Sequence, residues 1–388
     1  MQPSKRLERI PPYLFAELER KVAAKRAAGV DVISLGIGDP DRPTPALVVE
    51  AMQEAVSEPE THQYPSNRGR DDFREAVSDF YQRRFDVGLD RETEVMPVIG
   101  AKECIFNLNL AFLDEGDVAL AADPGYPVYT GGPLLVGAEP VLLPLLPERG
   151  FVPDLEAVPA DALERARLIY LNYPNNPTGA VVPAGFFDRV VRFARDHDLL
   201  VVHDNAYSEI TFDGYRAPSF LATPGAKEVG VEVFSLSKGY NMTGWRAGAI
   251  VGNSEAIAAY WRLKSNVDSG LFEAVQLASI AAFSPDGDGE AAEMCSVYQR
   301  RRDAVVDALR EAGVQVTPPK ATIYVWAPIP EGYESSAAYC EHVLEETGVV
   351  ISPGGAYGPS GEGFFRISLT TPDRRLMEAV QRLSALGR

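Results

Sequence analysis

One short stretch near the middle of the chain gathers hydroxyl, amine and guanidinium side chains. It contains Ser235, Ser237 and Lys238, and Arg246 follows eight residues after the lysine. The stretch comes directly after the apolar run Val231–Phe234, so Lys238 lies beyond the carboxyl end of an expected strand, where α/β sheets present reactive groups. Two hydroxyls and a guanidinium can bind phosphate oxygens. A hydroxyl-rich surface loop is the alternative, but the combination and its spacing favour an anion site beside a reactive amine.

Two further charged side chains lie at or inside apolar, strand-like runs. Asp204 follows Leu199–Val202, so its carboxylate is expected to be partly desolvated; a helix N-cap or a strand-end salt bridge is the alternative role. Arg366 lies in the β-type run Phe364–Leu369, where a guanidinium needs an anionic partner. A carboxylate offers the matching fork, either from another side chain or from a ligand.

Three other positions carry weaker signals of their own. Gly100-Ala101-Lys102 closes a strand and opens a helix, and free N–H groups at a helix N-terminus bind phosphate. Asn176 stands in an Asn-Pro-Thr-Gly sequence, which is also good turn chemistry. Tyr126 stands in a Pro-Gly-Tyr-Pro turn, where an aromatic ring serves equally well for packing.

The elements that must position these residues alternate between strands and helices. The expected strands are Val32–Leu35, Val95–Ile99, Val118–Ala121, Pro140–Leu143, Leu168–Leu171, Leu199–His203, Val231–Ser235 and Gly248–Val251. Several are almost continuously apolar, which is typical of strands covered on both faces. Expected helices between them are Phe73–Arg84, Lys102–Phe112 and Ala184–His197. The alternation predicts an α/β fold with a mostly parallel sheet.

The pattern changes after about Ser284. A long helical stretch over Gly289–Ala312 leads to a strand at Ile323–Ala327, a helix at Ser336–Thr347 and the strands Val349–Ser352 and Phe364–Leu369. We therefore expect three parts: residues 1–40 as an N-terminal arm with part of a small domain, 41–283 as a large domain, and 284–388 as a small α+β domain.

Composition limits the function classes. The formal net charge is −18, from 55 acidic and 37 basic residues, which disfavours nucleic acid as a partner. Cys104, Cys295 and Cys340 show neither disulfide nor zinc spacing, so no metal site is expected. We find no apolar run of membrane-spanning length and no signal-peptide pattern. These features predict a soluble, cytoplasmic protein without a membrane partner.

Taken together, the motifs of this chain resemble those of one enzyme family. Ser-x-Ser-Lys followed by Gly-Trp-Arg resembles the cofactor-lysine signature of the class I and II aminotransferases, which are fold-type-I enzymes dependent on pyridoxal 5′-phosphate (PLP). Further landmarks in the expected order are Gly100-Ala101-Lys102, Asp123-Pro124-Gly125-Tyr126-Pro127, Tyr173-Pro174-Asn175-Asn176-Pro177-Thr178-Gly179, His203-Asp204-Asn205-Ala206-Tyr207 and Phe365-Arg366-Ile367-Ser368. The resemblance spans essentially the whole chain and implies a large PLP-binding domain with a mostly parallel, seven-stranded type of sheet.

The resemblance also implies roles for the site residues. Lys238 would hold PLP as a Schiff base and shuttle a proton, Asp204 would keep the pyridine nitrogen protonated, and Tyr126 would stack on the ring. Further cofactor contacts are implied for Ala101, Lys102, Asn176, Tyr207, Ser235, Ser237 and Arg246 and, from the partner subunit of a homodimer with shared active sites, for Tyr64 and Asn266. Substrate contacts are implied for Arg366, which would hold the α-carboxylate, and for Tyr13, Gly38, Lys102 and Asn176.

Within this class the chain resembles the LL-diaminopimelate aminotransferase family, through its Pro11–Glu17, Ser34–Pro40 and Ser265–Gly270 segments. That family interconverts LL-diaminopimelate plus 2-oxoglutarate with tetrahydrodipicolinate plus glutamate, in lysine and cell-wall synthesis. Two positions depart from its pattern: Asn67 stands where plant-type members carry an acidic residue, and Ala101 replaces a more usual serine. The alternatives are an aspartate, alanine or aromatic aminotransferase, a PLP β-lyase, or a non-catalytic regulator with this fold.

Overall fold

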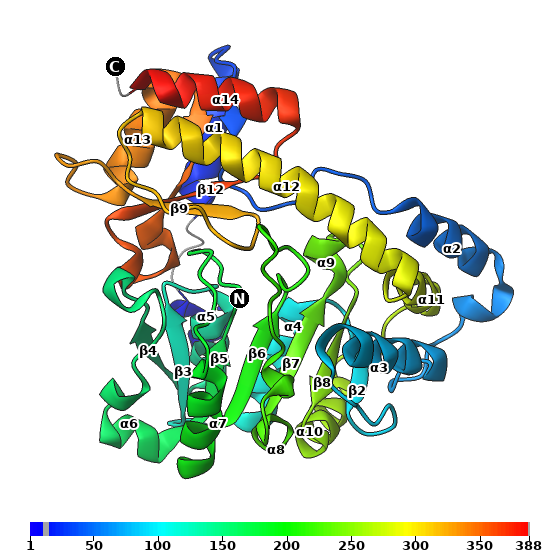
Figure 1. Cartoon of the computed structure of the whole chain (residues 1–388). Coiled ribbons are helices and arrows are strands. Elements are labelled where there is room, and N and C mark those ends of the chain that lie inside the picture. The colour runs from blue at the N-terminus through cyan, green and yellow to red at the C-terminus, as the bar shows by residue number, and fades with distance from the viewer. Residues whose placement is uncertain (11–14, 387–388) are drawn as a thin grey trace.

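A seven-stranded sheet forms the centre of the molecule (Figure 1). The structure is a computed structural model that describes residues 1–10 and 15–386. The sheet consists of β2 (Val95–Val98), β3 (Val118–Asp123), β4 (Glu139–Pro144), β5 (Ala166–Leu171), β6 (Leu200–Asn205), β7 (Gly230–Ser235) and β8 (Gly248–Gly252), in the spatial order β2-β8-β7-β6-β5-β3-β4. In this sheet β8 runs in the direction opposite to the other six strands and is antiparallel to both β2 and β7. The predicted mostly parallel α/β sheet is therefore confirmed.

Helices cover both faces of this sheet, which explains its continuously apolar strands. Alternate residues of a strand point to opposite faces. Val118 and Leu120 of β3 pack in one buried apolar cluster together with residues of the helices on that side. Ala119 and Ala121 pack in a second cluster on the other face. The helices are α2 (Ala46–Ser57), α3 (Asp71–Phe85), α4 (Ala101–Phe112), α5 (Val128–Val136), α6 (Ala160–Arg165), α7 (Phe186–Asp196), α8 (Ala226–Val229), α9 (Leu236–Gly239), α10 (Ser254–Lys264) and α11 (Glu273–Ala282).

A second group of elements lies beside the sheet and has its own buried core. The antiparallel strands β9 (Tyr324–Pro328), β11 (Ser352–Pro353) and β12 (Phe364–Ser368) pack with α13 (Ser336–Thr347) and α14 (Asp373–Leu386). The long helix α12 (Pro285–Glu311) runs across the top of the molecule and connects the two groups (Figure 1).

The N-terminal elements α1 (Phe15–Ala27) and β1 (Ile33–Ser34) join this second group. β1 pairs in parallel with β10 (Val349–Val350), and α1 makes ion pairs to α13 through Lys21 and Lys25. The short 3-10 turns are Lys5–Arg9, Pro59–His62, Pro147–Arg149, Leu155–Ala157, Phe220–Ala222, Gly354–Tyr357 and Pro359–Gly361. The domain boundaries expected near residues 40 and 284 stay a prediction.

Most element boundaries differ from the predicted ones by one or two residues. The largest difference is at α12, which begins at Pro285 instead of Gly289. Ser284 caps this helix by accepting a hydrogen bond from the Gly287 N–H at 3.2 Å, and proline is favoured in a first helical turn. Val32–Leu35 was expected among the strands and lies outside the large sheet, because its hydrogen-bonding partner is β10.

Neither a membrane-spanning helix nor a cluster of metal-ligating side chains occurs among the described residues. No helix over residues 1–10 and 15–386 is long and apolar enough to cross a membrane. Within the same ranges, no cluster of His, Cys, Asp and Glu side chains has the arrangement needed to hold a metal ion.

Candidate active site

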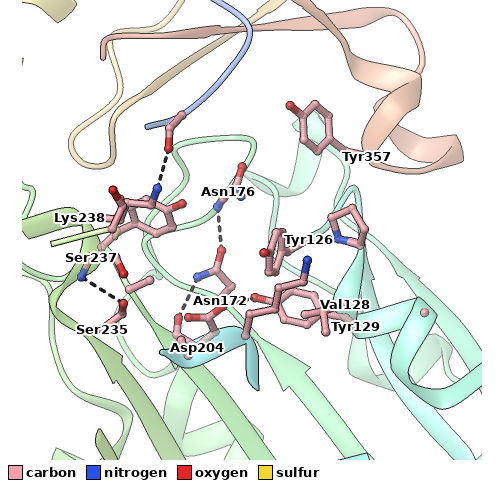
Figure 2. Close-up of a pocket in the computed structure, with 18 of the residues that line it drawn as sticks. Tyr126, Val128, Tyr129, Asn172, Asn176, Asp204, Ser235, Ser237, Lys238 and Tyr357 are labelled. Carbon is pink, nitrogen blue, oxygen red and sulfur yellow. Dashed lines mark hydrogen bonds between the residues drawn. The ribbon is translucent and has the colours of Figure 1, made fainter. Parts of the chain in front are cut away.

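A pocket of about 650 Å³ opens at the carboxyl ends of the parallel strands. Figure 2 shows part of its lining, with side chains from several strand ends converging on one space. Twelve of the predicted site residues line this pocket: Gly38, Ala101, Lys102, Tyr126, Asn176, Asp204, Tyr207, Ser235, Ser237, Lys238, Arg246 and Arg366. Residues that lie more than 300 positions apart in the sequence thus meet at one site.

Lys238 and Asp204 extend from the ends of neighbouring strands. β6 and β7 pair in parallel, with Asp204 opposite Val233, and Lys238 lies three residues beyond the end of β7. The Lys238 ammonium donates a hydrogen bond to the Gly38 carbonyl at 2.5 Å. The Ser235 side chain caps the short helix α9 by accepting from the Ser237 N–H at 3.2 Å. The amine is therefore held at the strand end and directed into the pocket.

Asp204 is almost fully buried and retains one oxygen for a further partner. Its Oδ2 accepts a hydrogen bond from the Tyr129 hydroxyl at 2.7 Å. In the part of the chain that the structure describes, no side chain donates to Oδ1. Burial raises the pKa of Asp204 to about 6, against the lowering effect of the Tyr129 hydrogen bond and the His203 charge. Such a carboxylate favours a cationic N–H donor in the pocket.

Buried amides connect Asp204 to the opposite wall. Asn172, which follows β5, donates to the Asp204 carbonyl at 2.8 Å, and its side-chain oxygen accepts from the Asn176 N–H at 2.8 Å (Figure 2). The Asn176 side-chain oxygen in turn accepts from Arg366 at 2.9 Å. This chain of hydrogen bonds fixes the Asn176 amide over the pocket.

Arg366 is a buried guanidinium placed between two aromatic rings. Its central carbon lies 4.0 Å from the Tyr324 ring centre and 4.7 Å from the Tyr357 ring centre. Its hydrogen bonds go to uncharged oxygens, those of Asn176 and of the Gly36 carbonyl at 2.8 Å. Among the described residues nothing accepts from its Nε. A buried cation with neutral partners can bind an incoming carboxylate.

The residues predicted to bind phosphate meet at the start of α4. Gly100 caps this helix with φ of 78°, and a Cβ there would overlap the Arg246 guanidinium. Glycine therefore lets Arg246 lie directly over the helix N-terminus. Ser235 and Ser237 line the same pocket. Free N–H groups, hydroxyls and a guanidinium together form an anion site.

Lys102 and Tyr126 form the wall beyond this anion site. The Lys102 ammonium lies 5.8 Å from the centre of the Tyr126 ring, within cation–π distance. The Tyr126 ring meets Tyr129 edge to face, with 5.9 Å between ring centres. The Tyr126 ring is thus supported from behind by the tyrosine that hydrogen-bonds Asp204.

Two predicted residues, Tyr64 and Asn266, do not line the pocket in this single chain. Tyr64 is 88% exposed, and Asn266 is exposed and donates to the Arg262 carbonyl at 2.9 Å. Tyr13 lies outside the described residues. The segments that carry Tyr64 and Asn266 adjoin one another, since Gly270 packs against Pro65. Both residues therefore belong to one exposed surface.

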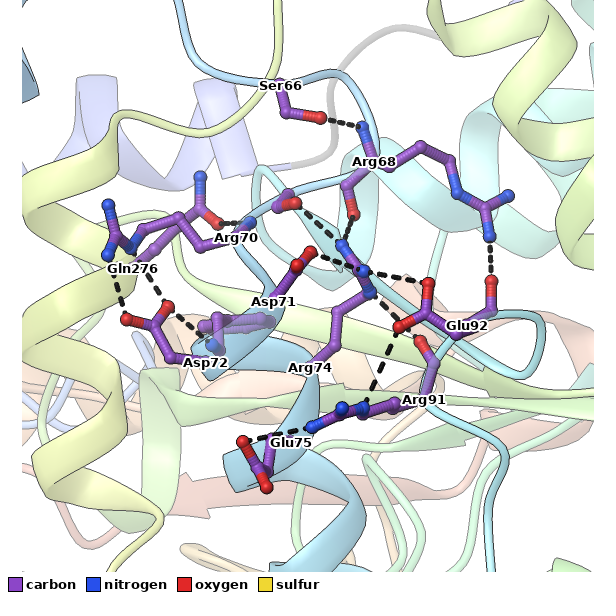
Figure 3. Close-up of polar contacts among 12 residues, drawn as sticks. Ser66, Arg68, Arg70, Asp71, Asp72, Arg74, Glu75, Arg91, Glu92 and Gln276 are labelled. Atoms are coloured by element: carbon purple, nitrogen blue, oxygen red, sulfur yellow. Dashed lines mark hydrogen bonds and ion pairs between the residues drawn. The ribbon is translucent and has the colours of Figure 1, made fainter.

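The segment after Tyr64 is held by an arginine network at the start of α3 (Figure 3). Arg74 is buried and donates to the Gly69 carbonyl at 2.7 Å and to the Arg91 carbonyl at 2.9 Å. It also pairs with Asp71 at 2.7 Å and Glu92 at 3.2 Å. The loop behind Tyr64 is therefore ordered although Tyr64 itself is exposed.

Sequence reasoning missed several residues of the pocket wall, among them Tyr129, Asn172, Tyr324 and Tyr357. A signal existed for Asn172, because it directly follows the apolar strand that ends at Leu171. The three tyrosines carry no comparable signal. Their sequence neighbours are apolar or turn residues, and only the fold brings them against Asp204 and Arg366.

Comparisons with known proteins agree with this geometry. Residues 30–383 match the family model "Aminotransferase class I and II". The chain is 55% identical to an LL-diaminopimelate aminotransferase of Desulforudis audaxviator (99% of this chain, 98% of the relative) and 54% identical to one of Moorella thermoacetica (99% and 98%). Among solved structures, substrate-bound BacF from Bacillus subtilis superposes with a TM-score of 0.94 at 37% identity, covering 100% of this chain and 98% of that one. The chain belongs to the class I and II aminotransferases.

Proposed function

We propose that this protein is a PLP-dependent aminotransferase acting on LL-2,6-diaminopimelate and 2-oxoglutarate, with tetrahydrodipicolinate and glutamate as products, in the cytoplasmic synthesis of lysine and peptidoglycan. The aminotransferase class follows from the family. The substrate is supported by relatives of that name at 54–55% identity over nearly the full length. The observation that carries the cofactor proposal is the placement of Lys238 and the buried Asp204 on neighbouring strand ends of one pocket.

The pocket fits the three functional parts of PLP. The Lys238 amine suits the aldehyde, and the Asp204 oxygen without a side-chain donor suits the protonated ring nitrogen. The anion site at the start of α4, with Ser235, Ser237 and Arg246, suits the phosphate. When bound, PLP supplies an aldehyde that condenses with amines and a ring that accepts the electron pair left at the substrate Cα.

Each residue of the pocket then has a defined task. Arg366 binds the substrate α-carboxylate through its fork of N–H groups. The Lys238 amine removes the proton from the substrate Cα, and acid–base transfer of this kind contributes roughly 10²–10⁴ in rate. Asp204 holds a proton at the ring nitrogen, because a buried carboxylate is stabilised by an adjacent cation. Tyr126 covers one face of the ring.

The two departures from the family pattern bear on the substrate. Ala101 keeps the backbone N–H at the start of α4 while removing a hydroxyl from the anion site. Asn67 can accept a hydrogen bond from an ammonium but supplies no charge. We therefore expect weaker discrimination between diaminopimelate and other amino acids than an acidic residue at this position would give.

We further propose that the enzyme works as a homodimer with shared active sites. Tyr64 is 88% exposed, and neighbouring loop residues contact two exposed apolar rings, Arg68 lying over Trp261 and His62 meeting Phe272. A second copy of the chain would cover these side chains and would receive Tyr64 and Asn266 in its own site.

Replacement of Lys238 by alanine tests the cofactor proposal. Purified wild-type protein should carry the long-wavelength visible band of lysine-bound PLP, and Lys238→Ala should lose that band and at least 10²-fold in turnover while keeping its far-UV circular dichroism. Lys5→Ala, which removes an exposed lysine outside the pocket, serves as the control. Wild-type transamination by Lys238→Ala would contradict the role.

A half-reaction screen tests the substrate. The loaded enzyme is mixed separately with LL-diaminopimelate, glutamate, aspartate, alanine, phenylalanine and cystathionine, and the loss of the visible band is followed. Diaminopimelate and glutamate should react fastest. Faster reaction with aspartate or an aromatic amino acid, or pyruvate release from cystathionine, would assign a different substrate.

A further inference from the structure

Tyr324 belongs to the wall of the pocket and has no role in the proposed function so far. It is the first residue of β9 and is only 3% exposed, yet its side chain lines the pocket. Three groups with proposed roles lie around it: Tyr207, Arg366 and Gly38. A side chain in contact with several parts of a site can determine how they are oriented.

The Tyr324 hydroxyl contacts the hydroxyl of Tyr207. The two oxygens are 3.2 Å apart, and the rings meet at 65° with 5.7 Å between centres. Each phenol carries one proton. If Tyr207 directs its own proton at the cofactor's ring oxygen, its oxygen can only accept, so Tyr324 must be the donor of the bond between them. A phenol that accepts such a bond becomes a stronger donor itself.

The ring of Tyr324 is packed as closely as its hydroxyl. Arg366 lies over one face with its central carbon 4.0 Å from the ring centre. A Cβ on Gly38 would overlap the Tyr324 hydroxyl, so glycine at that position leaves room for the phenol. The Gly38 carbonyl accepts from Lys238 at 2.5 Å. The ring therefore supports the guanidinium on one side and adjoins the lysine-bearing wall on the other.

Charges around the two phenols affect them in opposite directions. Burial raises the pKa of Tyr324, but the charges of Arg366 and Lys238 together with the Tyr207 hydrogen bond outweigh it, and the pKa lies below the usual tyrosine value. Burial raises the pKa of Tyr207 well above its usual value, and the charge and hydrogen bond of Tyr324 and the charge of Asp204 add to this. Tyr324 is therefore the more acidic of the two phenols.

We infer that Tyr324 is a positioning residue with two separable functions, in which its hydroxyl donates to Tyr207 and its ring supports Arg366. The inference rests on the proposed function, since it assigns Tyr207 to the cofactor and Arg366 to the substrate. The hydroxyl should affect the acidity of the bound cofactor. The ring should affect the binding of the substrate carboxylate.

Two substitutions separate these functions. Tyr324→Phe removes the hydroxyl and keeps the ring, so the pH midpoint of the cofactor's visible band should rise by about 0.5–1 unit, because a weaker hydrogen bond to an ionised oxygen stabilises it less. The KM for the amino acid should change by less than about 2-fold. Tyr324→Leu also removes the cation–π support, so KM should rise by roughly 5–10-fold in addition.

A double-variant cycle with Tyr207→Phe tests whether Tyr324 acts through Tyr207. The pH midpoint of the double variant Tyr207→Phe/Tyr324→Phe should equal that of Tyr207→Phe alone. The visible titration needs no turnover. Tyr339→Phe, a buried tyrosine of α13 outside the pocket, should leave both the midpoint and KM unchanged.

The outcomes separate this inference from the proposed function. A wild-type protein without a visible cofactor band and without transamination would overturn both. If the wild type is loaded and active, an unchanged pH midpoint in Tyr324→Phe would overturn the hydroxyl's function alone. Additive shifts of the pH midpoint in the double variant would have the same meaning. An unchanged KM in folded Tyr324→Leu would overturn the function of the ring.

Discussion

Asp204 combines burial with a free oxygen, and this combination predicts how the cofactor-free protein responds to pH. Its pKa is raised from an ordinary aspartate value to about 6, mainly by burial. Between these values the folded state binds more protons than the unfolded state, so the free energy of unfolding falls as the pH rises from about 4 to about 6. Above that range the ionised carboxylate destabilises the empty pocket by about 3 kcal/mol, at roughly 1.4 kcal/mol per unit of pKa shift.

Asp204→Asn should remove the destabilisation that the ionised carboxylate causes in the cofactor-free protein. At pH 7.5 the cofactor-free variant should be more stable than cofactor-free wild type by about 2–3 kcal/mol, and the difference should vanish near pH 4. With PLP bound the order should reverse, because the carboxylate then pairs with a cation. Urea unfolding at both pH values, with and without PLP, measures this. Glu54→Gln, on the exposed surface of α2, provides an equal change in charge. A pH-independent difference between Asp204→Asn and wild type would contradict the raised pKa.

Single residues were predictable where strand ends and motifs pointed to them. Lys238 and Asp204 follow apolar strands, and the pocket contains both. Tyr129 and Tyr324 were not predictable, because their relevance depends on contacts with Asp204 and Tyr207 that are distant in sequence. Tertiary packing, which local pattern does not encode, decides which buried tyrosines reach the site.

At the scale of elements, hydrogen bonds from the start of α3 hold the exposed loop that carries Tyr64. Arg74 donates to main-chain carbonyls of Gly69 and Arg91, and its acidic partners Asp71 and Glu92 are largely exposed (Figure 3). The bonds to these carbonyls, of which the one to Gly69 is buried and the one to Arg91 part-buried, should therefore matter more than the ion pairs. Lost hydrogen bonds from a charged donor cost about 1–3 kcal/mol, whereas exposed ion pairs contribute about 0–1 kcal/mol.

Arg74→Met should lower the free energy of unfolding by about 2 kcal/mol and loosen the loop that carries Tyr64. Chemical denaturation measures the first effect, and hydrogen exchange at the Ser66–Arg70 amides measures the second. Arg91→Met is the matched control, since its guanidinium is half exposed and its ion pairs within residues 1–10 and 15–386 are with the surface side chains of Glu75 and Glu92. Equal losses of stability in the two variants would show that the hydrogen bonds from Arg74 to the carbonyls contribute no more to stability than surface ion pairs do.

The elements themselves were largely predictable, and the exceptions have physical causes. Seven expected strands appear in the large sheet because both of its faces are buried and the strands are correspondingly apolar. The antiparallel direction of β8 leaves no trace in its composition, since a buried strand is apolar in either direction. The pairing of β1 with β10 joins segments more than 300 residues apart, and two-residue strands carry too little pattern to reveal it.

At the scale of the whole molecule, two separate regions take part in the proposed reaction. They are the pocket, which is lined by cationic side chains, and an exposed surface. The chain has a net charge of −18, yet Lys102, Lys238, Arg246 and Arg366 all line one pocket. Anionic substrates and cofactor are thus attracted locally by a protein that is acidic as a whole. The second region is the surface with Tyr64 and Asn266, whose predicted contribution requires another copy of the chain.

A mixing experiment decides whether that surface completes a site. Lys238→Ala and Tyr64→Ala should each have little activity as homodimers. In a mixed dimer, one site combines Lys238 of the Tyr64→Ala chain with Tyr64 of the Lys238→Ala chain and is intact, whereas the other site lacks both. Random exchange makes about half of the dimers mixed, with one working site of two, so activity should recover to about a quarter of wild type. The arithmetic follows from isologous pairing. If the sites were instead built from single chains, mixing would restore nothing beyond the average of the two variants, and Tyr64 would need a role within its own subunit that its 88% exposure argues against.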